Sequence, residues 1–329
     1  MRIPSTKVLA LVAGAAAVVL SACAVQGGSS GGGAGEYPSR PVEFTVPTQP
    51  GGSTDLVTRA LTRSLEAPLG AQTVVVNKPG ANGKIAGKDV FSGAPDGYRV
   101  AVMPQSLFAI GPLMINDPDA IKLDDMSFVK GLAVEDYVLA VPVNSRFRTV
   151  PDLVTGGRVA YGTTGAGTGS QLSQALLFGL AKVPAAPVPF DGGAPLLNAL
   201  LGGKVDAGSL QIAEAFKQIE AGTLRPLMVF GTKRVEALPE VPTATELGYP
   251  IVVDQRRFVA APAGLPSETR DELAVAIDKA VASPEYAQTL KSNYIGRWDA
   301  NGDEVRAQLT QSLEQFRAMT QQLGVSLAG

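Results

Sequence analysis

Short β-branched runs alternate with helical patterns along most of the chain, and this alternation constrains the fold more than any other feature. The runs expected to form strands are Val42–Val46, Thr73–Val76, Arg99–Met103, Val138–Val143, Arg158–Tyr161 and Leu224–Phe230. Apolar residues recur at helical spacing in Leu56–Leu65, Leu172–Leu180 and Ile212–Glu220. Strands that alternate with helices favour parallel sheets, so we expect an α/β fold.

Two further helices are expected near the C-terminus. The first is predicted to be capped by Ser267 and to pack through Leu273, Ile277 and Val281. The second carries one apolar stripe, made by Val305, Leu309, Leu313 and Phe316. Both patterns are typical of helices that pack on a core.

The N-terminal segment has the layout of a secretory signal peptide. It carries the cations Arg2 and Lys7, no acid, and then the apolar run Val8–Leu20, which is too short to span a bilayer comfortably. The run ends in Leu20-Ser21-Ala22-Cys23, which resembles the bacterial lipobox. We therefore expect a lipoprotein signal peptide over 1–22, a lipid on Cys23, and a Gly- and Ser-rich tether over 23–36.

The composition argues against several classes of function. The chain has no histidine, and this removes the commonest general base and the commonest metal ligand. Cys23 is the only cysteine, so no intramolecular disulfide can form. A net charge of −2 gives no electrostatic basis for binding nucleic acid. No acidic cluster has the spacing of a calcium loop. We expect no enzyme activity, no cofactor and no metal.

Two segments share one design, in which a strand runs into a Gly-rich turn and directly into a helix. They are Val46–Asp55 and Tyr161–Ser170. Such a turn presents unpaired backbone N–H groups at the positive end of a helix dipole, which suits a carboxylate or a phosphate.

With both loops in view, the chain resembles the extracytoplasmic solute receptors of the tripartite tricarboxylate transporter system, also called Bug receptors, in a lipoprotein form. The resemblance runs from about Tyr37 to Gly324. It rests on an ordered set of motifs: Tyr37–Pro41, Pro50–Asp55, Asn77–Gly83, Ala94–Tyr98, Gly165–Ser170, Leu201–Asp206, Leu238–Thr243 and Ala261–Gly264.

The resemblance implies a two-lobed periplasmic-binding-protein fold of type II, which closes like a flytrap. Lobe 1 is expected to contain 37–137 and 258–329, and lobe 2 to contain 138–257. By the same analogy the chain crosses between the lobes near Tyr137–Pro142 and returns near Arg257–Pro262.

The resemblance further implies a monomeric receptor, tethered by lipid outside the cytoplasm. It would bind a small organic carboxylate and deliver it to the integral membrane subunits of a permease. The candidate ligand-binding residues are Gln49, Gly51, Gly52, Ser53, Thr54 and Asp55 on one lobe, and Thr164, Gly165, Thr168, Ser170 and Gln171 on the other. The motifs leave open whether the ligand is a dicarboxylate, a tricarboxylate, an acidic amino acid or an aromatic acid.

The chain departs from the family pattern at several positions near the expected cleft. Gln171 stands where a histidine is usual, and Phe190-Asp191 stands where Tyr-Lys is frequent. Asp191 either faces the cleft, where it would favour an amine, or lies on a solvated loop. Arg256 and Arg257 lie on opposite faces of a strand, so at most one of them is expected to reach the ligand.

Two other functions fit parts of the sequence. Ser127-Phe128-Val129-Lys130 matches the Ser-x-x-Lys pattern of penicillin-recognising enzymes, which would make the chain an exported serine hydrolase. That pattern belongs at a helix start, whereas Met126–Val129 is expected to be a strand or turn. Ser170 is not within Gly-x-Ser-x-Gly, and a triad lacks its histidine. The altered positions 171, 190 and 191 are also compatible with an interaction lipoprotein that has lost its ligand.

Overall fold

The computed structural model describes residues 37–325, so the signal segment 1–22, Cys23 and the tether 23–36 lie outside the described residues. The elements in chain order are β1 Val42–Val46, α1 Ser53–Leu69, β2 Thr73–Asn77, η1 Ala81–Gly83, α2 Lys84–Phe91, β3 Arg99–Pro104, α3 Ser106–Ala109, α4 Gly111–Met114, η2 Leu123–Asp125, β4 Met126–Pro142, α5 Val150–Thr155, β5 Val159–Thr163, α6 Gly169–Leu180, β6 Ala185–Pro189, α7 Gly193–Leu201, β7 Ala207–Gln211, α8 Ile212–Glu220, β8 Leu224–Val229, β9 Asp254–Pro262, α9 Ser267–Val281, α10 Pro284–Ser292, β10 Gly296–Arg297 and α11 Gly302–Gln322.

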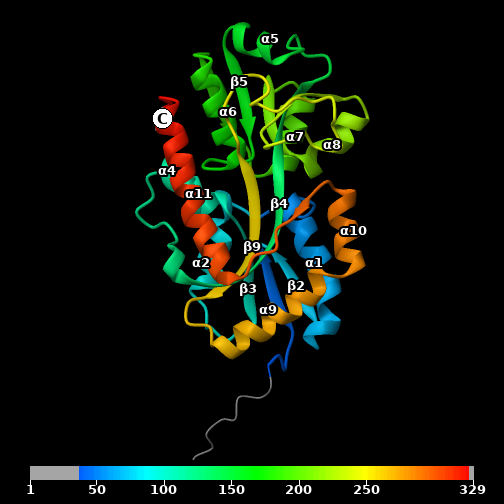
Figure 1. Ribbon diagram of the computed structural model, residues 1–329, viewed down its shortest axis with the longest axis vertical. Helices are drawn as coiled ribbons and strands as arrows, with labels where there is room; N and C mark the ends of the chain where they lie inside the picture. Colours follow the sequence, from blue (N-terminus) through cyan, green and yellow to red (C-terminus); the bar gives the residue numbers. More distant parts are fainter. Residues whose placement is uncertain (1–36, 326–329) are drawn as a thin grey trace, which may run out of the picture. The chain divides into compact units, whose positions relative to one another are not determined.

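The strands follow the order β2-β1-β3-β9-β4-β7-β5-β6, and β8 and β10 also pair with β4 (Figure 1). Strand β1 runs parallel to β2 and β3, and β5 runs parallel to β6 and β7. The long strands β4 and β9 are antiparallel to their neighbours. The expected α/β fold is confirmed, but its sheets are mixed, since the parallel outer strands flank the antiparallel strands β4 and β9.

Strand β4 joins the two halves of the sheet. Its residues Met126–Asp136 pair with β9, whereas Tyr137–Pro142 pair with β7 and β8. We call the half that contains β1, β2, β3, β9 and β10 lobe 1, and the half that contains β5 to β8 lobe 2. The two lobes thus share one continuous strand.

Two parts of the expected division into lobes need correction. Residues 254–257 were assigned to lobe 2, but Asp254–Arg257 already pair with Ala133–Asp136 of β4 in lobe 1. Helix α11 was assigned wholly to lobe 1, yet Phe316 packs in the cluster of Tyr137, Leu172 and Phe178 in lobe 2. In Figure 1, α11 runs alongside both lobes. Backbone pairing and side-chain packing set these boundaries, and no local motif marks them.

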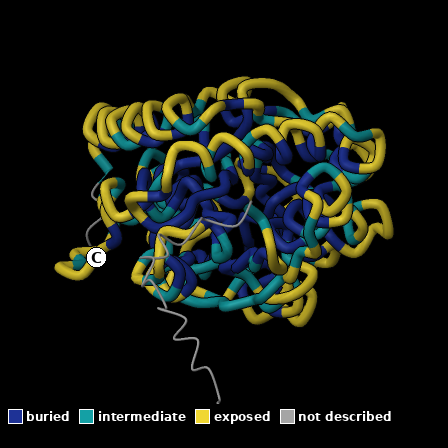
Figure 2. Tube along the Cα trace, turned by 90° about the horizontal axis from the view of Figure 1, so that it is seen from below, coloured by how far each residue is buried: buried dark blue, intermediate teal, exposed yellow. Residues whose placement is uncertain are grey.

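Helices cover the buried strands. Helices α9 and α10 pack beside α1 on lobe 1. Figure 2 shows buried segments at the centre, surrounded by helical turns with exposed outer faces. The predicted cap at Ser267 is wrong: the N-cap of α9 is Pro266, whose ψ of 139° places the helix boundary before Ser267. The predicted stripe of α11 is confirmed, since Val305, Leu309 and Phe316 are buried and Leu313 is partly buried against the same cluster as Phe316.

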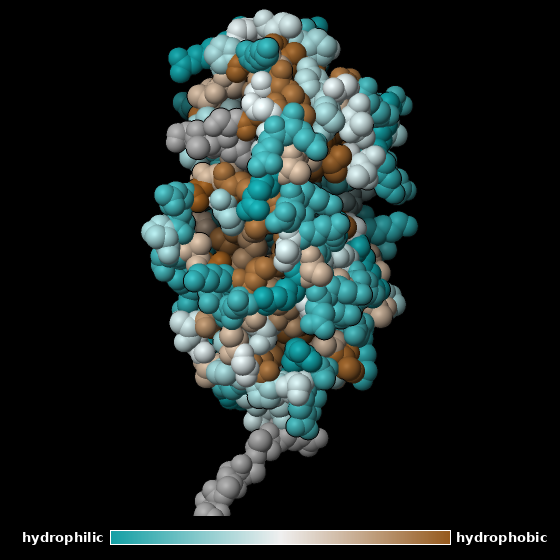
Figure 3. All heavy atoms as spheres, turned by 60° about the vertical axis from the view of Figure 1, so that its left-hand side comes forward, coloured by the Kyte–Doolittle hydropathy of each residue, from teal (hydrophilic) through white to brown (hydrophobic). Residues whose placement is uncertain are grey.

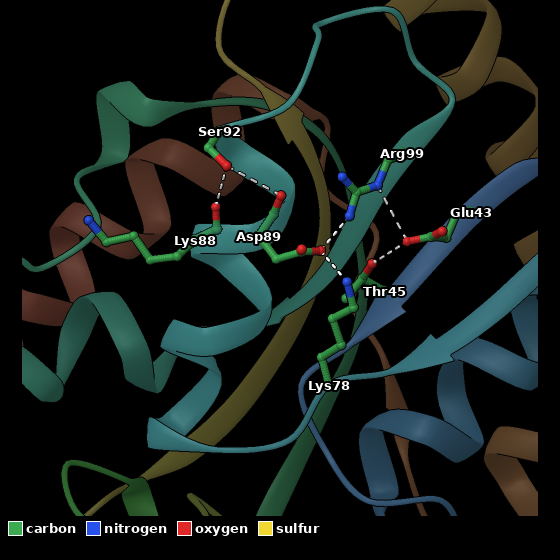
Figure 4. A network of polar contacts seen from close by, with 7 residues as sticks. All are labelled: Glu43, Thr45, Lys78, Lys88, Asp89, Ser92 and Arg99. Carbon is green, nitrogen blue, oxygen red and sulfur yellow. Dashed lines mark hydrogen bonds and ion pairs between the residues drawn. The ribbon is translucent and has the colours of Figure 1, made fainter.

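A polar network fixes the segment that leads from β2 to α2 (Figure 4). Asp89 of α2 pairs with both Lys78 and Arg99, and the Arg99 Nε atom lies 3.5 Å from Oε1 of Glu43 on β1. The hydrogen bond from Lys78 is the main reason why the pKa of Asp89 lies below its usual value. The network anchors the start of segment 78–83, whose far end carries Asn82.

Candidate functional site

A cavity of about 1390 Å³ lies between the two lobes. Lobe 1 lines it through 47–54, 79–84 and 104–121, and lobe 2 lines it through 164–168 and 189–195. The face shown in Figure 3 is hollowed at mid-height, where apolar atoms gather inside a rim of hydrophilic side chains. A concave, largely apolar cavity with a few placed polar groups is typical of a small-molecule site.

The first Gly-rich loop brings the N-terminus of α1 to the cavity. Gly52 is the N-cap of α1 and makes no side-chain capping bond; the first N–H group of the helix, that of Ser53, donates instead to Oε1 of Glu214 at 3.4 Å. Thr48, Gln49, Gly52 and Thr54 line the cavity, whereas Gly51, Ser53 and Asp55 are absent from its lining. The Thr48 hydroxyl oxygen is buried without a hydrogen-bond partner.

Asp55 shapes this loop from behind. Its carboxylate accepts hydrogen bonds of 2.9 Å from the Gly51 N–H, the Asn77 amide and the Arg59 Nε. Burial alone would raise the pKa of Asp55, but these donors outweigh it and lower the pKa. Gly51 has a φ of +85°, which glycine adopts without strain. Asp55 and Gly51 therefore hold the loop in shape.

The second Gly-rich loop reaches the cavity through Thr164, Gly165 and Thr168. Thr168 also caps α6, because its hydroxyl accepts from the Gln171 N–H at 3.3 Å. Ser170 lies behind the loop and is fully buried. Its hydroxyl accepts from the Thr164 N–H at 3.1 Å and donates to the Ser209 carbonyl at 2.5 Å. Ser170 thus connects the loop to β7.

Gln171 does not line the cavity. Its Oε1 atom accepts a hydrogen bond of 2.8 Å from the Gly167 N–H, at a residue with a φ of +70°. At this position, where the family usually has histidine, the side chain therefore supports the loop.

A third helix N-terminus, at α7, also reaches the cavity. Gly192 is its N-cap, has a φ of +106°, and makes no side-chain capping bond. Asp191, Gly192 and Gly193 all line the cavity, and Asp191 is exposed. Sequence reasoning selected only Asp191 here; the Gly192-Gly193 pair before an apolar helical run was the available signal for the rest.

Glu214, in the first turn of α8, places a carboxyl group between the N-termini of α1 and α7. Its Oε1 atom accepts from the Ser53 N–H at 3.4 Å, and a Cβ atom at Gly193 would lie 2.2 Å from its Cδ atom. Its Oε2 atom is buried without a hydrogen-bond partner. Burial, and then the charge of Glu135, raise the pKa of Glu214 to about 7.

Glu135 ties both lobes together beneath the cavity. On β4, it accepts from the Ser53 hydroxyl, from Arg257 at 3.0 Å, and from the Ala213 N–H of α8 at 2.8 Å. Sequence reasoning missed both Glu135 and Glu214. The signal for Glu135 was an acid within the otherwise largely apolar run Met126–Pro142. Glu214 carried no distinguishing local pattern.

Neither of the two candidate arginines lines the cavity. Arg257 is fully buried and donates to Glu135 and, at 2.9 Å, to the Thr54 hydroxyl. Arg256 pairs with Asp254 at 3.1 Å and stacks over Trp298. At most one of them was expected to reach the ligand, and both cations are paired with acids of the chain itself.

Asn82 bridges the lobes at another point of the cavity wall. Its amide donates to the Gly167 carbonyl at 2.8 Å, and its Oδ1 atom accepts from the Ser106 hydroxyl at 2.8 Å. Asn82 has a φ of +53°, a conformation that asparagine tolerates better than most residues. It lies within the family motif Asn77–Gly83, and its amide was the missed signal.

The Ser-x-x-Lys pattern does not form a nucleophile and base. Ser127 lies on β4, as expected for a strand, and its hydroxyl accepts from the Leu265 N–H at 3.2 Å. Lys130 pairs with Asp278 at 2.6 Å and Asp299 at 2.8 Å. Burial opposes the charge of Lys130, but the two acids raise its pKa overall, which disfavours a neutral amine base.

Within residues 37–325, no three side chains among His, Cys, Asp and Glu are grouped to hold a metal ion. The helices of this same stretch include none with both the length and the apolar character to cross a membrane.

Residues 57–325 match the family described as "Tripartite tricarboxylate transporter family receptor". The chain is 32% identical over 287 residues to the Pseudomonas sp. (strain P51) "UPF0065 protein in tcbD-tcbE intergenic region", covering 84% of each chain. The solved periplasmic binding protein BugD is similar with a TM-score of 0.82 and 27% identity, over 89% of this chain and all of that one (100%). R. palustris Rpa4515, solved with adipate, has a TM-score of 0.83 and 25% identity, over 88% of this chain and 99% of that one. The chain therefore belongs to the receptor family of tripartite tricarboxylate transporters, and it has the two-lobed α/β fold of periplasmic binding proteins.

Proposed function

We propose that the chain is an extracytoplasmic receptor that binds a small organic carboxylate in the cavity between its lobes and delivers it to membrane permease subunits. One observation carries this proposal: the N-termini of α1 and α7, each with a glycine N-cap and no side-chain cap, open into the same cavity from different lobes. Two helix N-termini attract an anion through N–H donors and dipoles without a buried cation.

The relatives support the carboxylate and the permease. Rpa4515 was solved with adipate, which is a dicarboxylate. The family description names a transporter receptor, which supports membrane subunits as partners. A receptor of this kind needs no catalytic residues, and the hydrogen bonds of Ser127 and Ser170 give both serines structural roles.

The proposed contacts divide into two groups. The residues proposed to contact the ligand line the cavity: Thr48, Gln49, Gly52, Thr54, Thr164, Gly165, Thr168, Gly192 and Gly193. The residues proposed to position them lie behind: Gly51, Ser53, Asp55, Ser170 and Gln171. We expect the lobes to close by rotation about β4 and the step from Val253 to Asp254, because the chain passes between the lobes at these two places.

A thermal-shift screen tests the ligand class. Mono-, di- and tricarboxylates, acidic amino acids, aromatic acids and neutral sugars are added to the protein at equal concentrations. A ligand that binds the folded state raises Tm by mass action, so carboxylates should raise it and neutral sugars should not. If only neutral sugars raised Tm, the proposed ligand class would be wrong. If no compound acted, the ligand-free interaction lipoprotein would be the better description.

Anchoring is tested separately. We propose that Cys23 carries a lipid and that segment 23–36 keeps the receptor near its permease at high effective concentration. Replacing Cys23→Ser should move the protein from the membrane fraction to the soluble fraction and leave ligand affinity unchanged. Membrane retention of this variant would contradict lipidation at Cys23.

A serine-reactive probe tests the hydrolase alternative. Intact-mass measurement after exposure to a fluorophosphonate should show no adduct, because neither serine has a nearby free base. An adduct on Ser127 or Ser170 would favour the hydrolase.

A further inference from the structure

The charges around the cavity do not match a ligand with several carboxylates. The lining residues, all within the described part of the chain, include the acids Asp117, Asp191 and Glu214 and a single cation, Lys84. Lys84 is paired with Asp117 at 2.7 Å and with Asp119 at 3.6 Å. A second ligand carboxylate would therefore meet acids without a free cation to balance it.

The unpartnered oxygen of Glu214 indicates which chemical group a ligand brings to this part of the cavity. A buried acceptor without a donor is costly, and native proteins rarely keep one without a function. The backbone N–H groups of Ser53 and Gln211 both lie close to the Glu214 carboxyl group and Ser53 donates to Oε1, but Oε2 has no hydrogen bond of good geometry within the described residues and belongs to a side chain of the cavity wall. The group best suited to this oxygen is a cationic N–H donor supplied by a ligand.

A carboxylate has its own place close to Glu214. Gly52, the N-cap of α1, directly precedes Ser53, and a Cβ atom at Gly52 would lie 3.3 Å from the unpartnered Thr48 hydroxyl oxygen. The start of α1 thus has a hydroxyl that can donate to an anion on one side and the Glu214 carboxyl on the other. The two sites favour groups of opposite charge on one ligand.

We propose that Glu214 binds an ammonium group of the solute, so that the ligand is an amino-carboxylic acid with its carboxylate at the N-terminus of α1. This inference rests on the proposed function and specifies its substrate class. The remaining wall includes Leu107, Leu113, Met114, Ile115 and Phe190, which suits an apolar body on the ligand.

Matched pairs of ligands test this assignment on the full-length chain in detergent. The pairs are leucine with 4-methylpentanoate, phenylalanine with 3-phenylpropanoate, and glutamate with glutarate, each measured by calorimetry and thermal shift. At least one amino acid should bind tenfold or more tightly than its amine-free partner. Glu214→Gln, which keeps the side-chain shape, should lower the affinity for that amino acid at least tenfold. It should also reduce the ratio between the affinities for the amino acid and for its amine-free partner. Glu220 is an exposed acid at the end of the same helix α8, so Glu220→Gln should change neither the amino-acid affinity nor this ratio.

A second measurement uses only the unaltered protein. The charged groups facing Glu214 are Glu135 from β4 and Arg257 from β9; α1, α7 and β7 contribute the uncharged Ser53, Gly193 and Gln211. Ionised Glu214 binds an ammonium group and repels a carboxylate. Between pH 5.5 and about 7.5, affinity for the amino acid should therefore rise, while affinity for the amine-free acid should fall.

The outcomes distinguish failure of the Glu214 assignment from failure of the proposed carboxylate receptor. If amine-free acids bind as tightly as amino acids, or if Glu214→Gln leaves their ratio unchanged in a folded protein, the assignment of Glu214 is wrong while the carboxylate receptor stands. Opposite pH trends with the expected signs support Glu214 even if the variant does not fold. If no carboxylate binds at all, both proposals fail.

Discussion

Arg257 and Glu135 form an ion pair of 3.0 Å in which neither side chain has any exposed surface. The pair joins β9 to β4 close to where β4 passes from one lobe to the other. Ser53 of α1 and Ala213 of α8 donate to the same carboxylate, so Glu135 is a common partner for both lobes.

Breaking this pair should destabilise the fold strongly. Glu135→Ala leaves the Arg257 guanidinium buried without its acid, and loss of one partner from a buried pair costs about 3–5 kcal/mol. Urea unfolding measures the difference. The double variant Glu135→Leu with Arg257→Met should cost less than Glu135→Ala, because it leaves no unpaired charge.

The surface pair Arg234–Glu246 provides the matched control. Its side chains are 43% and 46% exposed. Arg234→Ala should lower the free energy of unfolding by less than about 1 kcal/mol, since exposed pairs contribute little. Equal losses for Glu135→Ala and Arg234→Ala would show that burial of the first pair has no energetic consequence.

Glu214 should make the ligand-free protein less stable as pH rises. Its pKa is about 7 in the folded state, above the ordinary value of 4.5, so the folded state binds more protons than the unfolded state between these values. The free energy of unfolding therefore falls from pH 4.5 to about 7 through this group. Glu214→Gln should raise Tm at pH 8, by about 2–4 °C per kcal/mol relieved, and act much less at pH 5. An equal rise at both values would contradict the raised pKa.

Gln171 should act on binding through the loop it supports. Gln171→Ala removes the acceptor of the Gly167 N–H, a loss of about 0.5–1.5 kcal/mol in stability, and frees the second Gly-rich loop. Ligand affinity should fall although the side chain does not line the cavity. Gln171→Glu keeps an acceptor oxygen near the start of α6 and should restore most of the affinity. A failure of this rescue would contradict the supporting role.

Two substitutions at Asn82 distinguish the effect of its hydrogen bond between the lobes from the effect of backbone strain. Asn82→Gly removes the hydrogen bond to the Gly167 carbonyl but suits the φ of +53°, whereas Asn82→Ala removes the bond and adds about 1–2 kcal/mol of strain. Both variants should lower ligand affinity by up to about tenfold. Only Asn82→Ala should also show the larger loss in urea unfolding. Unchanged affinity in Asn82→Gly would mean that the bridge does not assist closure.

Much of the fold was predictable because its signals are local. Short β-branched runs and helical patterns placed strands such as Val42–Val46 and helices such as Ile212–Glu220 at their observed positions. Thr168 and Gly52 lie at helix starts, as the two Gly-rich motifs indicated. The boundary at Asp254 was missed because strand pairing, rather than a break in sequence pattern, determines it.

The sequence by itself determined the α/β fold, the two Gly-rich loops and the family resemblance, because each depends on residues close together in the chain. Only the tertiary structure decided which residues of those loops face the cavity, and that Asp55, Ser170 and Gln171 turn away from it to hold backbone donors. It also brought Glu214 within 3.4 Å of the Ser53 N–H, 161 positions away along the chain. The charge of the cavity depends on such distant pairings, because a side chain's burial and partners arise only when the lobes are packed together.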